Sequence, residues 1–425
     1  MIELVAISDL HLGVKDSCLT PSGTSCPCLD DLIDAWKKEI PKDVKKPTLV
    51  IIGDLLDLSL ASYAESMPAA KIFFTKIVGA ELFKDILYIP GNHDHHIWHH
   101  IVEEKFVYEK ILPSCNLQSD YPRTKSLIVT DQGDECDSGV FFSNTFLNGF
   151  LPANSSITNI KVTYPNLLLK PENDPIPIIF THGHFFEKSW TFITDITKEI
   201  FKQLTIDDFE TYNAPLTEFI WYNLGQSKKL SDLVDDIYSS AQSGNTNYLD
   251  NLMHMVMQGI EAMNVKAKHK IEQHLIDNFM EFSAKEVVNY LFKGATKYSR
   301  KASMRNMEIG DTIPKVEEYF KNYLANDLNQ ANCSKYKVVF GHTHQPGKGL
   351  VTINDNPIEI YNTGGWILDK NDLLFFFFLV WRAGGAPNQK EKRDRLGWRF
   401  TQGCGLGGLA LGYHLAAPDG GMALR

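Results

Sequence analysis

The segment Thr48-Leu49-Val50-Ile51-Ile52-Gly53-Asp54-Leu55-Leu56-Asp57 joins a short, mainly apolar and β-branched run to a turn that carries two aspartates. Such a run followed by glycine is typical of a buried strand that ends where the glycine begins. Open α/β sheets place their ligands just beyond the carboxyl ends of their strands. The segment therefore predicts an α/β fold with a functional site at the end of this strand.

Four other blocks repeat this arrangement of an apolar run followed by polar side chains. The runs and blocks are Ile2–Ile7 before Asp9-Leu10-His11, Ile86–Ile89 before Gly91-Asn92-His93-Asp94, Ile176–Phe180 before His182-Gly183-His184, and Lys337–Phe340 before Gly341-His342-Thr343-His344. Because each block follows a predicted strand, we expect these distant segments to converge on one polar site.

The remaining periodicity extends the α/β prediction. Apolar residues recur at helical spacing in Asp30–Ile40 and His95–Leu112. Strand character returns in Leu127–Thr130, Gly139–Phe142 and Ile358–Tyr361. This alternation predicts two stacked mixed β-sheets flanked by helices.

Residues 185–336 contain no convincing strand pattern and form a predicted helical cap insertion. The helices expected there are Trp190–Leu204, Leu216–Leu224, Tyr248–Ala262, Ala267–Phe292 and Val316–Leu328. Because the insertion separates two of the polar blocks, it must leave the core near one of them and return near the other. We therefore predict a catalytic core made of residues 1–184 and 337–381, with the cap beside its site.

Residues 382–425 differ in composition from the rest of the chain. They hold five of the eight arginines and ten of the 29 glycines. We interpret this Gly/Arg-rich segment as an anomalous, non-native tail and expect no catalytic residue in it; the alternative is a divergent extension. Its Gly403–Gly408 stretch has the spelling G-x-G-x-x-G, but no preceding strand supports a dinucleotide site.

Composition and charge limit the functional classes. The chain has 425 residues, of which 44% are hydrophobic and 22% are charged, as in an ordinary globular protein. The first 381 residues hold 35 basic against 49 acidic side chains, a balance of −14, which disfavours general binding of nucleic acid.

Neither secretion nor a membrane span is expected. A strand predicted from residue 2 leaves no room for a secretory leader, and the longest apolar run, Leu373–Trp381, is much shorter than the roughly 20 residues of a transmembrane helix. The seven cysteines are odd in number and lack a repeating spacing, so we expect reduced thiols and a cytoplasmic protein.

The donor types in the five blocks suit a pair of divalent metal ions. Two ions about 3.5–4 Å apart can clamp the attacking and leaving oxygens of a displacement at phosphorus. Asp54 is the natural bridging carboxylate, and Asp9 and His11 point the same way from an extended segment. The other donors, Asn92, His182, His342 and His344, are neutral, so the pair keeps a net positive charge that favours phosphate and a bound hydroxide.

In their order and spelling, the five blocks resemble D-x-H, G-D-x-x-D, G-N-H-D/E, H-G and G-H-x-H of the calcineurin-like metallophosphoesterase superfamily. The resemblance implies an α/β/β/α sandwich. It implies that Asp9, His11 and His344 hold one metal, that Asn92, His182 and His342 hold the other, and that Asp54 bridges them. It also implies that a metal-bridging hydroxide attacks phosphorus, that His93 is the general acid, and that Asp57 fixes the tautomer of His93.

Carboxylate and imidazole donors without thiolate favour Mn, Fe, Zn or Co as the two divalent metal ions. His184 and His95 are candidate substrate contacts, although His184 could instead satisfy the backbone. We interpret the neighbouring His96, His99 and His100 as solvated or partner-bonded side chains rather than extra ligands. Asp94 is expected to hold its turn.

The leading functional prediction is a metal-dependent hydrolase of a phosphomonoester, phosphodiester or pyrophosphate. Its substrate would be a phosphorylated small molecule, a nucleotide or a lipid-linked compound, because H-G-H, a helical insertion and G-H-T-H-Q-P together are similar to the enzymes that cleave UDP-diacylglucosamine. The alternatives are a nuclease and a non-catalytic metal-binding scaffold.

The aromatic group Phe185, Phe186, Trp190 and Phe192 would pack the cap on the core or line an apolar groove.

Overall fold

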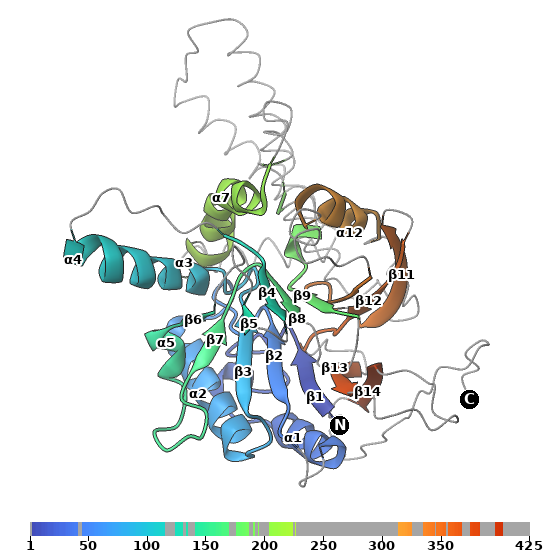
Figure 1. The fold of residues 1–425 in the computed structure, drawn as a ribbon. Helices are drawn as coiled ribbons and strands as arrows, with labels where there is room; N and C mark the ends of the chain where they lie inside the picture. The colour runs from blue at the N-terminus through green and yellow to red at the C-terminus, as the bar shows by residue number, and fades with distance from the viewer. Residues whose placement is uncertain are drawn as a thin grey trace, which may run out of the picture.

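The computed structural model describes most of the predicted core and two parts of the predicted cap. The described residues are 2–40, 45–114, 124–130, 133–134, 141–169, 176–186, 190–191, 194, 204–223, 226, 313–324, 335–344, 346–353, 356–367, 375–382 and 396–402. They form two β-sheets with helices around them (Figure 1).

Within this described part, the first sheet has seven strands in the order β14-β13-β1-β2-β3-β7-β6. Its strands are β1 (Ile2–Ile7), β2 (Thr48–Ile52), β3 (Asp85–Ile89), β6 (Phe142–Ser143), β7 (Ile160–Val162), β13 (Phe375–Arg382) and β14 (Leu396–Gln402). Strands β1, β2, β3 and β7 are parallel, whereas β6, β13 and β14 pair antiparallel. The carboxyl ends of β1, β2 and β3 therefore meet at one edge of the sheet.

The second sheet also has seven strands among the described residues, in the order β11-β12-β10-β9-β8-β4-β5. They are β4 (Leu127–Thr130), β5 (Gly133–Asp134), β8 (Asn166–Leu169), β9 (Ile178–Thr181), β10 (Lys337–Phe340), β11 (Gly347–Ile353) and β12 (Asn356–Asn362). Strand β10 lies parallel to both β9 and β12, so the blocks that follow β9 and β10 emerge side by side.

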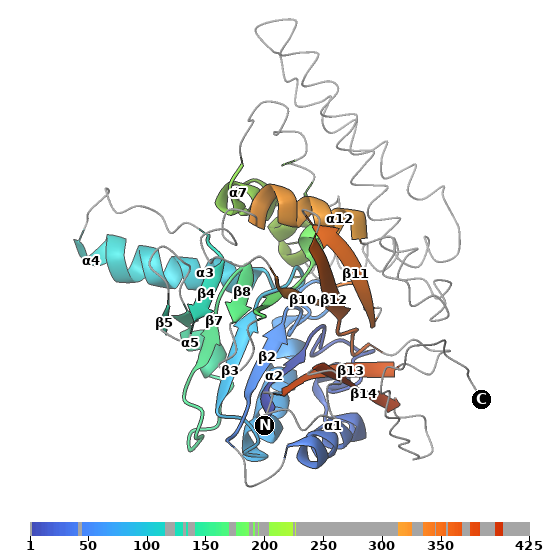
Figure 2. The same cartoon turned by 45° about the vertical axis from the view of Figure 1, so that its right-hand side comes forward.

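The central strands of the first sheet are mainly apolar, and both of their faces are buried. Alternate residues of a strand point to opposite faces. In β1, Leu4 and Ala6 pack in the cluster shared with Phe180 and Val339 of the second sheet. Val5 and Ile7 face the cluster that contains the helices. The expected class of two stacked mixed sheets flanked by helices is therefore confirmed, and Figure 2 shows the arrangement from a second side.

The helices of the core are outside the sheets. They are η1 (Pro21–Gly23), α1 (Pro27–Glu39), α2 (Tyr63–Gly79), α3 (His96–Val102), η2 (Glu103–Ile111), α4 (Leu112–Ser114), α5 (Thr145–Asn148) and η3 (His184–Phe186). Helices α1 and α2 lie beside β1–β3 in both views (Figures 1 and 2). The predicted helix His95–Leu112 corresponds to the consecutive elements α3, η2 and α4, of which η2 is π-helical.

Two described parts of the predicted cap are helical. Helix α7 (Ile206–Thr217) continues into η4 (Glu218–Asn223), and α12 (Ile313–Tyr319) continues into η6 (Phe320–Leu324). Phe209 of α7 packs against Phe185, with ring centroids 4.7 Å apart, and against Tyr319 of α12 at 5.9 Å. Phe185 and Phe186 are buried and contribute to this packing of cap helices on the core.

Other expectations for the cap fall outside the described residues. These are the helices Tyr248–Ala262 and Ala267–Phe292, nearly all of Trp190–Leu204, and Phe192. In the helices that are described, no stretch is long and apolar enough to span a bilayer.

Part of the anomalous tail forms an edge strand. Strand β13 continues to Arg382, and β14 pairs with it antiparallel from Phe375↔Gln402 to Trp381↔Leu396. Strand β14 is thus at the edge of the first sheet, next to β13 and beyond β1. The G-x-G-x-x-G spelling at 403–408 lies outside the described residues.

Among the three cysteines that the structure describes, the expectation of reduced thiols is wrong for Cys28. Cys28 is disulfide-bonded, whereas Cys18 and Cys26 are free. Disulfide formation depends on the approach of two Cβ atoms to about 4 Å in the folded chain. Spacing along the sequence does not reveal that approach.

Candidate metal centre

The ends of five strands bring the five polar blocks together. The loops are joined by backbone hydrogen bonds: the amide of Asp9 donates to the carbonyl of Gly53 over 3.1 Å, and the amide of Gly341 donates to the carbonyl of His182 over 3.0 Å. The amide of His342 also donates to the Asp9 carboxylate over 3.0 Å. The site therefore spans both sheets, as the strand-end positions of the blocks predict.

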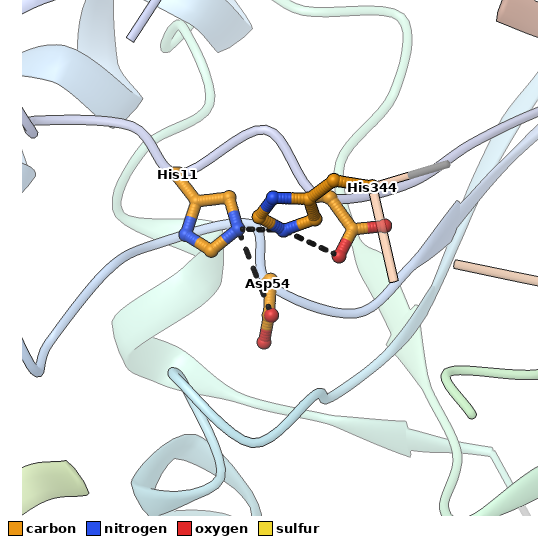
Figure 3. A group of neighbouring side chains, drawn as sticks. His11, Asp54 and His344 are labelled. Carbon is orange, nitrogen blue, oxygen red and sulfur yellow. Dashed lines mark hydrogen bonds and ion pairs between the residues drawn. The ribbon is translucent and has the colours of Figure 1, made fainter. Parts of the chain in front are cut away.

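The first group of donor side chains is Asp9, His11, Asp54 and His344. The Nε2 atoms of His11 and His344 lie 3.0 Å apart, and Nε2 of His344 lies 3.3 Å from the Asp9 carboxylate. Nε2 of His11 lies 3.7 Å from Oδ2 of Asp54. Figure 3 shows the two imidazoles and the Asp54 carboxylate turned toward one another.

The second group contains Asp54, His182 and His342, and Asn92 completes it. Nε2 of His182 lies 3.2 Å from Oδ2 of Asp54 and 3.0 Å from Oδ1 of Asn92. Nδ1 of His342 lies 2.9 Å from the same Asn92 oxygen. Oδ2 of Asp54 therefore faces both groups, which is the position of a bridging donor.

The chemistry of these donors fits divalent cations. The seven side chains are Asp9, His11, Asp54, Asn92, His182, His342 and His344. Imidazole nitrogens turned toward one another, with carboxylate and amide oxygens beside them, match the donors that Mn, Fe, Zn and Co accept. Within the described residues, the buried Nδ2 of Asn92 has no hydrogen-bond partner. No contact with the protein through Nδ2 therefore opposes the side-chain orientation in which Oδ1 faces the histidines.

Backbone strain gathers at the same residues. Asp9, His11, Asp54, His342 and His344 all have positive φ values, between 44° and 66°. A non-glycine residue held in this region costs on the order of 1–3 kcal/mol and typically marks a functional site. The strained backbone positions therefore coincide with the candidate metal donors.

Glycines in three blocks make room for donors from other blocks. A Cβ atom at Gly53 would overlap the His182 ring, one at Gly91 would overlap the Asp54 carboxylate, and one at Gly341 would overlap the Asp9 carboxylate. Each of these three glycines is therefore required because a side chain from another block occupies the space beside it.

We expect Gly91→Ala to displace Asp54 and weaken metal binding. The added Cβ would lie 2.6 Å from the backbone nitrogen of Asp54, which cannot rotate away. Overpacking of this kind costs typically about 1–3 kcal/mol of folding stability. Bound metal per chain and the midpoint of urea denaturation measure both effects.

The matched control is Gly79→Ala, because a Cβ at Gly79 meets no heavy atom within 4 Å. It should bind as much metal as the parent chain. Equal metal content in the two variants would contradict the interlocking of the blocks.

His93 and its partners form a hydrogen-bonded group beside the donors. Nδ1 of His93 lies 3.0 Å from Oδ1 of Asp57 and 2.8 Å from Oγ of Ser59. The other oxygen of Asp57 lies 2.8 Å from Nδ1 of His11. Asp57 thus holds both the candidate acid and one metal donor, and Ser59 donates to Asp57 over 2.6 Å.

Charge at the site favours ionised carboxylates and a protonated His93. Burial opposes ionisation of Asp54 and Asp57, but the surrounding imidazoles hold the pKa of each carboxyl below its usual range. Burial likewise opposes the charged form of His93, yet Asp57 and Asp54 outweigh it and raise the pKa of His93 to about 9. A protonated His93 is the state that a general acid requires.

Asp94 holds the turns around the centre, as predicted. Its Oδ2 accepts from the amides of Leu55 and Leu56 over 2.6 and 3.2 Å, and its Oδ1 accepts from the amide of Gly91 over 2.7 Å. These bonds tie the second block to the third.

The two candidate substrate contacts have different surroundings. Nε2 of His184 lies 3.1 Å from the Tyr164 hydroxyl, and the buried Nδ1 of His184 has no hydrogen-bond partner among the described residues. His95 is engaged through both ring nitrogens, by Glu218 at 2.7 Å and Glu210 at 2.6 Å. A contact between His95 and substrate would have to break one of these pairs.

Sequence reasoning missed several partners of the predicted residues. Ser8 donates to the Asp9 carboxylate and lies 2.6 Å from the Thr363 hydroxyl, while Glu210 and Glu218 approach α3 from the cap. Ser59 is two residues after Asp57 in the sequence, and this closeness could have indicated that its hydroxyl bonds to the Asp57 carboxylate. The carboxylates of the cap gave none, because only tertiary packing brings them to α3.

Comparison with known proteins agrees with the geometry. A family model, the calcineurin-like phosphoesterase model, matches residues 2–208. The matched stretch contains four of the five polar blocks and ends before the fifth, at 341–344. A search of curated proteins found no match for the chain.

Proposed function

Because residues 2–208 belong to the calcineurin-like phosphoesterase family, we propose that the chain is a hydrolase of phosphoric esters that works with two divalent metal ions. One observation carries the proposal: the buried Asp54 carboxylate faces two separate groups of buried metal donors. Two adjoining groups that share an oxygen are what a binuclear centre requires.

The donors divide between the two ions according to the groups they form. Asp9, His11 and His344 would hold one ion, and Asn92, His182 and His342 would hold the other. Asp54 would contact both. When bound, such ions polarise a phosphoryl group and lower the pKa of water, and the donor set suits Mn, Fe, Zn or Co.

His93 would protonate the leaving oxygen, and Asp57 would keep it in place for this step. Asp57 and Ser59 engage Nδ1 of His93 at 3.0 and 2.8 Å, which fixes the ring and assigns proton transfer to Nε2. The charge of Asp57 also stabilises the protonated ring. Hydroxide, formed when water loses a proton to solvent, would form the new P–O bond as the bond to the leaving oxygen breaks, and that oxygen would take the His93 proton.

The cap would border the substrate. We propose that residues 185–336 form this cap on a core of 1–184 and 337–381, and that the tail supplies no catalytic group. The ring of Trp190 lies 6.0 Å from that of His184 and 6.4 Å from that of His342. This buried indole supports a role for the start of the cap in enclosing the site.

The substrate would be a phosphorylated small molecule, a nucleotide or a lipid-linked phosphate. The balance of −14 over the first 381 residues opposes general attraction of nucleic acid, so a nuclease is not favoured. A metal-binding scaffold is also not favoured, because none of the seven predicted donors is missing from the site.

A substrate panel tests the proposal. The chain, loaded separately with Mn, Fe, Zn and Co, is assayed on a monoester, a diester, a nucleotide, a pyrophosphate and a nucleotide-linked lipid pyrophosphate. We expect metal-dependent phosphate or phosphoester release from at least one class, abolished by a chelator and restored by the metal. Absence of hydrolysis across the panel by a chain shown to bind two ions would contradict the enzymatic proposal and favour a scaffold.

A further inference from the structure

A second cluster of imidazoles and carboxylates lies where the cap meets α3. His95, which immediately precedes α3, and His99 of α3 have ring centroids 5.0 Å apart. Glu218, at the start of η4, approaches them from the cap. Their nearest donor atoms all lie within 4.8 Å of one another, and none of these residues belongs to the seven donors of the binuclear centre.

The spacing of the three donors fits a single cation. Oε1 of Glu218 lies 2.7 Å from Nδ1 of His95 and 3.8 Å from Nε2 of His99. Nitrogen and oxygen ligands about 2.1 Å from a tetrahedral ion are about 3.4 Å apart. The two observed separations lie on either side of that value, so small side-chain shifts would equalise them.

His95 already has the outer partner that metal-binding histidines usually show. Such a histidine binds the ion through one ring nitrogen and donates the other N–H to a carboxylate, which fixes its tautomer. Nε2 of His95 pairs with Glu210 over 2.6 Å, and the other oxygen of Glu210 accepts from the Tyr164 hydroxyl over 2.8 Å. Nδ1 of His95 is thereby directed at Glu218.

The surroundings of His99 and Glu218 also suit the binding of a cation. Nε2 of His99 is buried and has no hydrogen-bond partner in the described part of the chain. The second oxygen of Glu218 pairs with Nδ1 of His96 over 2.6 Å, which orients the carboxylate.

We propose that His95, His99 and Glu218 form a third divalent-metal site, separate from the binuclear centre, with Glu210 as its outer partner. Two imidazoles and one carboxylate leave a fourth position for water and suit Zn or Co. The ion fastens η4 and α7 of the cap to α3, which begins two residues after Asp94. It therefore connects the cap to the loop that carries His93.

Metal stoichiometry tests the site. The full-length chain is saturated with Co, freed of excess ion by dialysis and analysed by mass spectrometry. We expect three ions per chain for the parent and two for His99→Ala. The matched control is His100→Ala, which removes an exposed imidazole from the same helix and should keep three.

Two further variants separate loss of the site from loss of the fold or of the binuclear centre. Glu210→Gln keeps the size of the side chain and should weaken only the third ion, by about 10–100-fold, as loss of an outer partner does. Asp54→Asn should retain one Co ion with a visible absorption band, and adding His99→Ala should remove that band. A parent chain that binds two ions, or a His99→Ala chain that keeps three, would overturn the proposal whether or not the protein hydrolyses phosphoesters.

Discussion

Replacement of His93 by alanine is expected to lower kcat by about 10²–10⁴-fold while the proposed binuclear centre keeps its metal. His93 is not one of the seven donors; instead, its Nδ1 pairs with Asp57 and Ser59. Its removal therefore takes away the proton donor without taking away a ligand. Steady-state kinetics and metal analysis of the same preparation measure the two quantities separately.

The leaving group provides the sharpest control for His93→Ala. A phosphate ester of p-nitrophenol departs without much need of a proton, whereas an alkyl ester requires one. The loss of kcat should therefore be much larger on the alkyl ester. A loss of equal size on both esters, or a variant that no longer binds metal, would mean that His93 supports the structure and does not deliver a proton.

Asp54→Asn is expected to remove the proposed binuclear metal pair and the activity together. The carboxylate is fully buried, and its Oδ2 faces His11 at 3.7 Å and His182 at 3.2 Å, so both groups lose their shared negative charge. We expect turnover to fall by at least the roughly 10²–10³-fold that loss of one preorganised electrostatic group costs. Metal content and phosphate release are the measurements.

Most of the stabilisation of the chain by metal should be lost in the same variant. An ion that binds only the folded chain raises Tm with its concentration. The parent should show this rise, and Asp54→Asn should lose the part of it that comes from the proposed binuclear pair. Asp34→Asn, the same change at an exposed position of α1, is the control that should behave like the parent. Unchanged metal binding by Asp54→Asn would argue against a bridging role.

The strands that carry the site were predictable because each is buried on both faces and ends at a polar block. Strands β1, β2 and β10 have the predicted bounds, and β9 differs by two residues at its start and one at its end. Helix α2 was not predicted, since its apolar residues and its internal Pro68 blur the helical period. The short strands β7 and β8 depend on parallel partners distant in sequence, because β7 pairs with β3 and β8 pairs with β4.

The donors were predictable as residue types, but their geometry was not. The sequence places Gly91 beside Asn92, yet only the folded chain shows that Gly91 yields space to Asp54. The cluster of His95, His99 and Glu218 shows the same limit. The sequence favoured a solvated or partner-bonded His99 over an extra ligand, because only tertiary packing brings the Glu218 carboxylate to the two histidines.

The insertion of β10 between β9 and β12 has a consequence for biosynthesis. His342 and His344 follow β10, so they leave the ribosome long after Asp9, Asp54 and Asn92. A nascent chain that stops before them would lack one proposed donor for each of the two proposed ions, and so would any proteolytic fragment that ends in the proposed cap. Incomplete chains should therefore have no hydrolytic activity. Binding of the metal pair should occur only after both histidines have been synthesised.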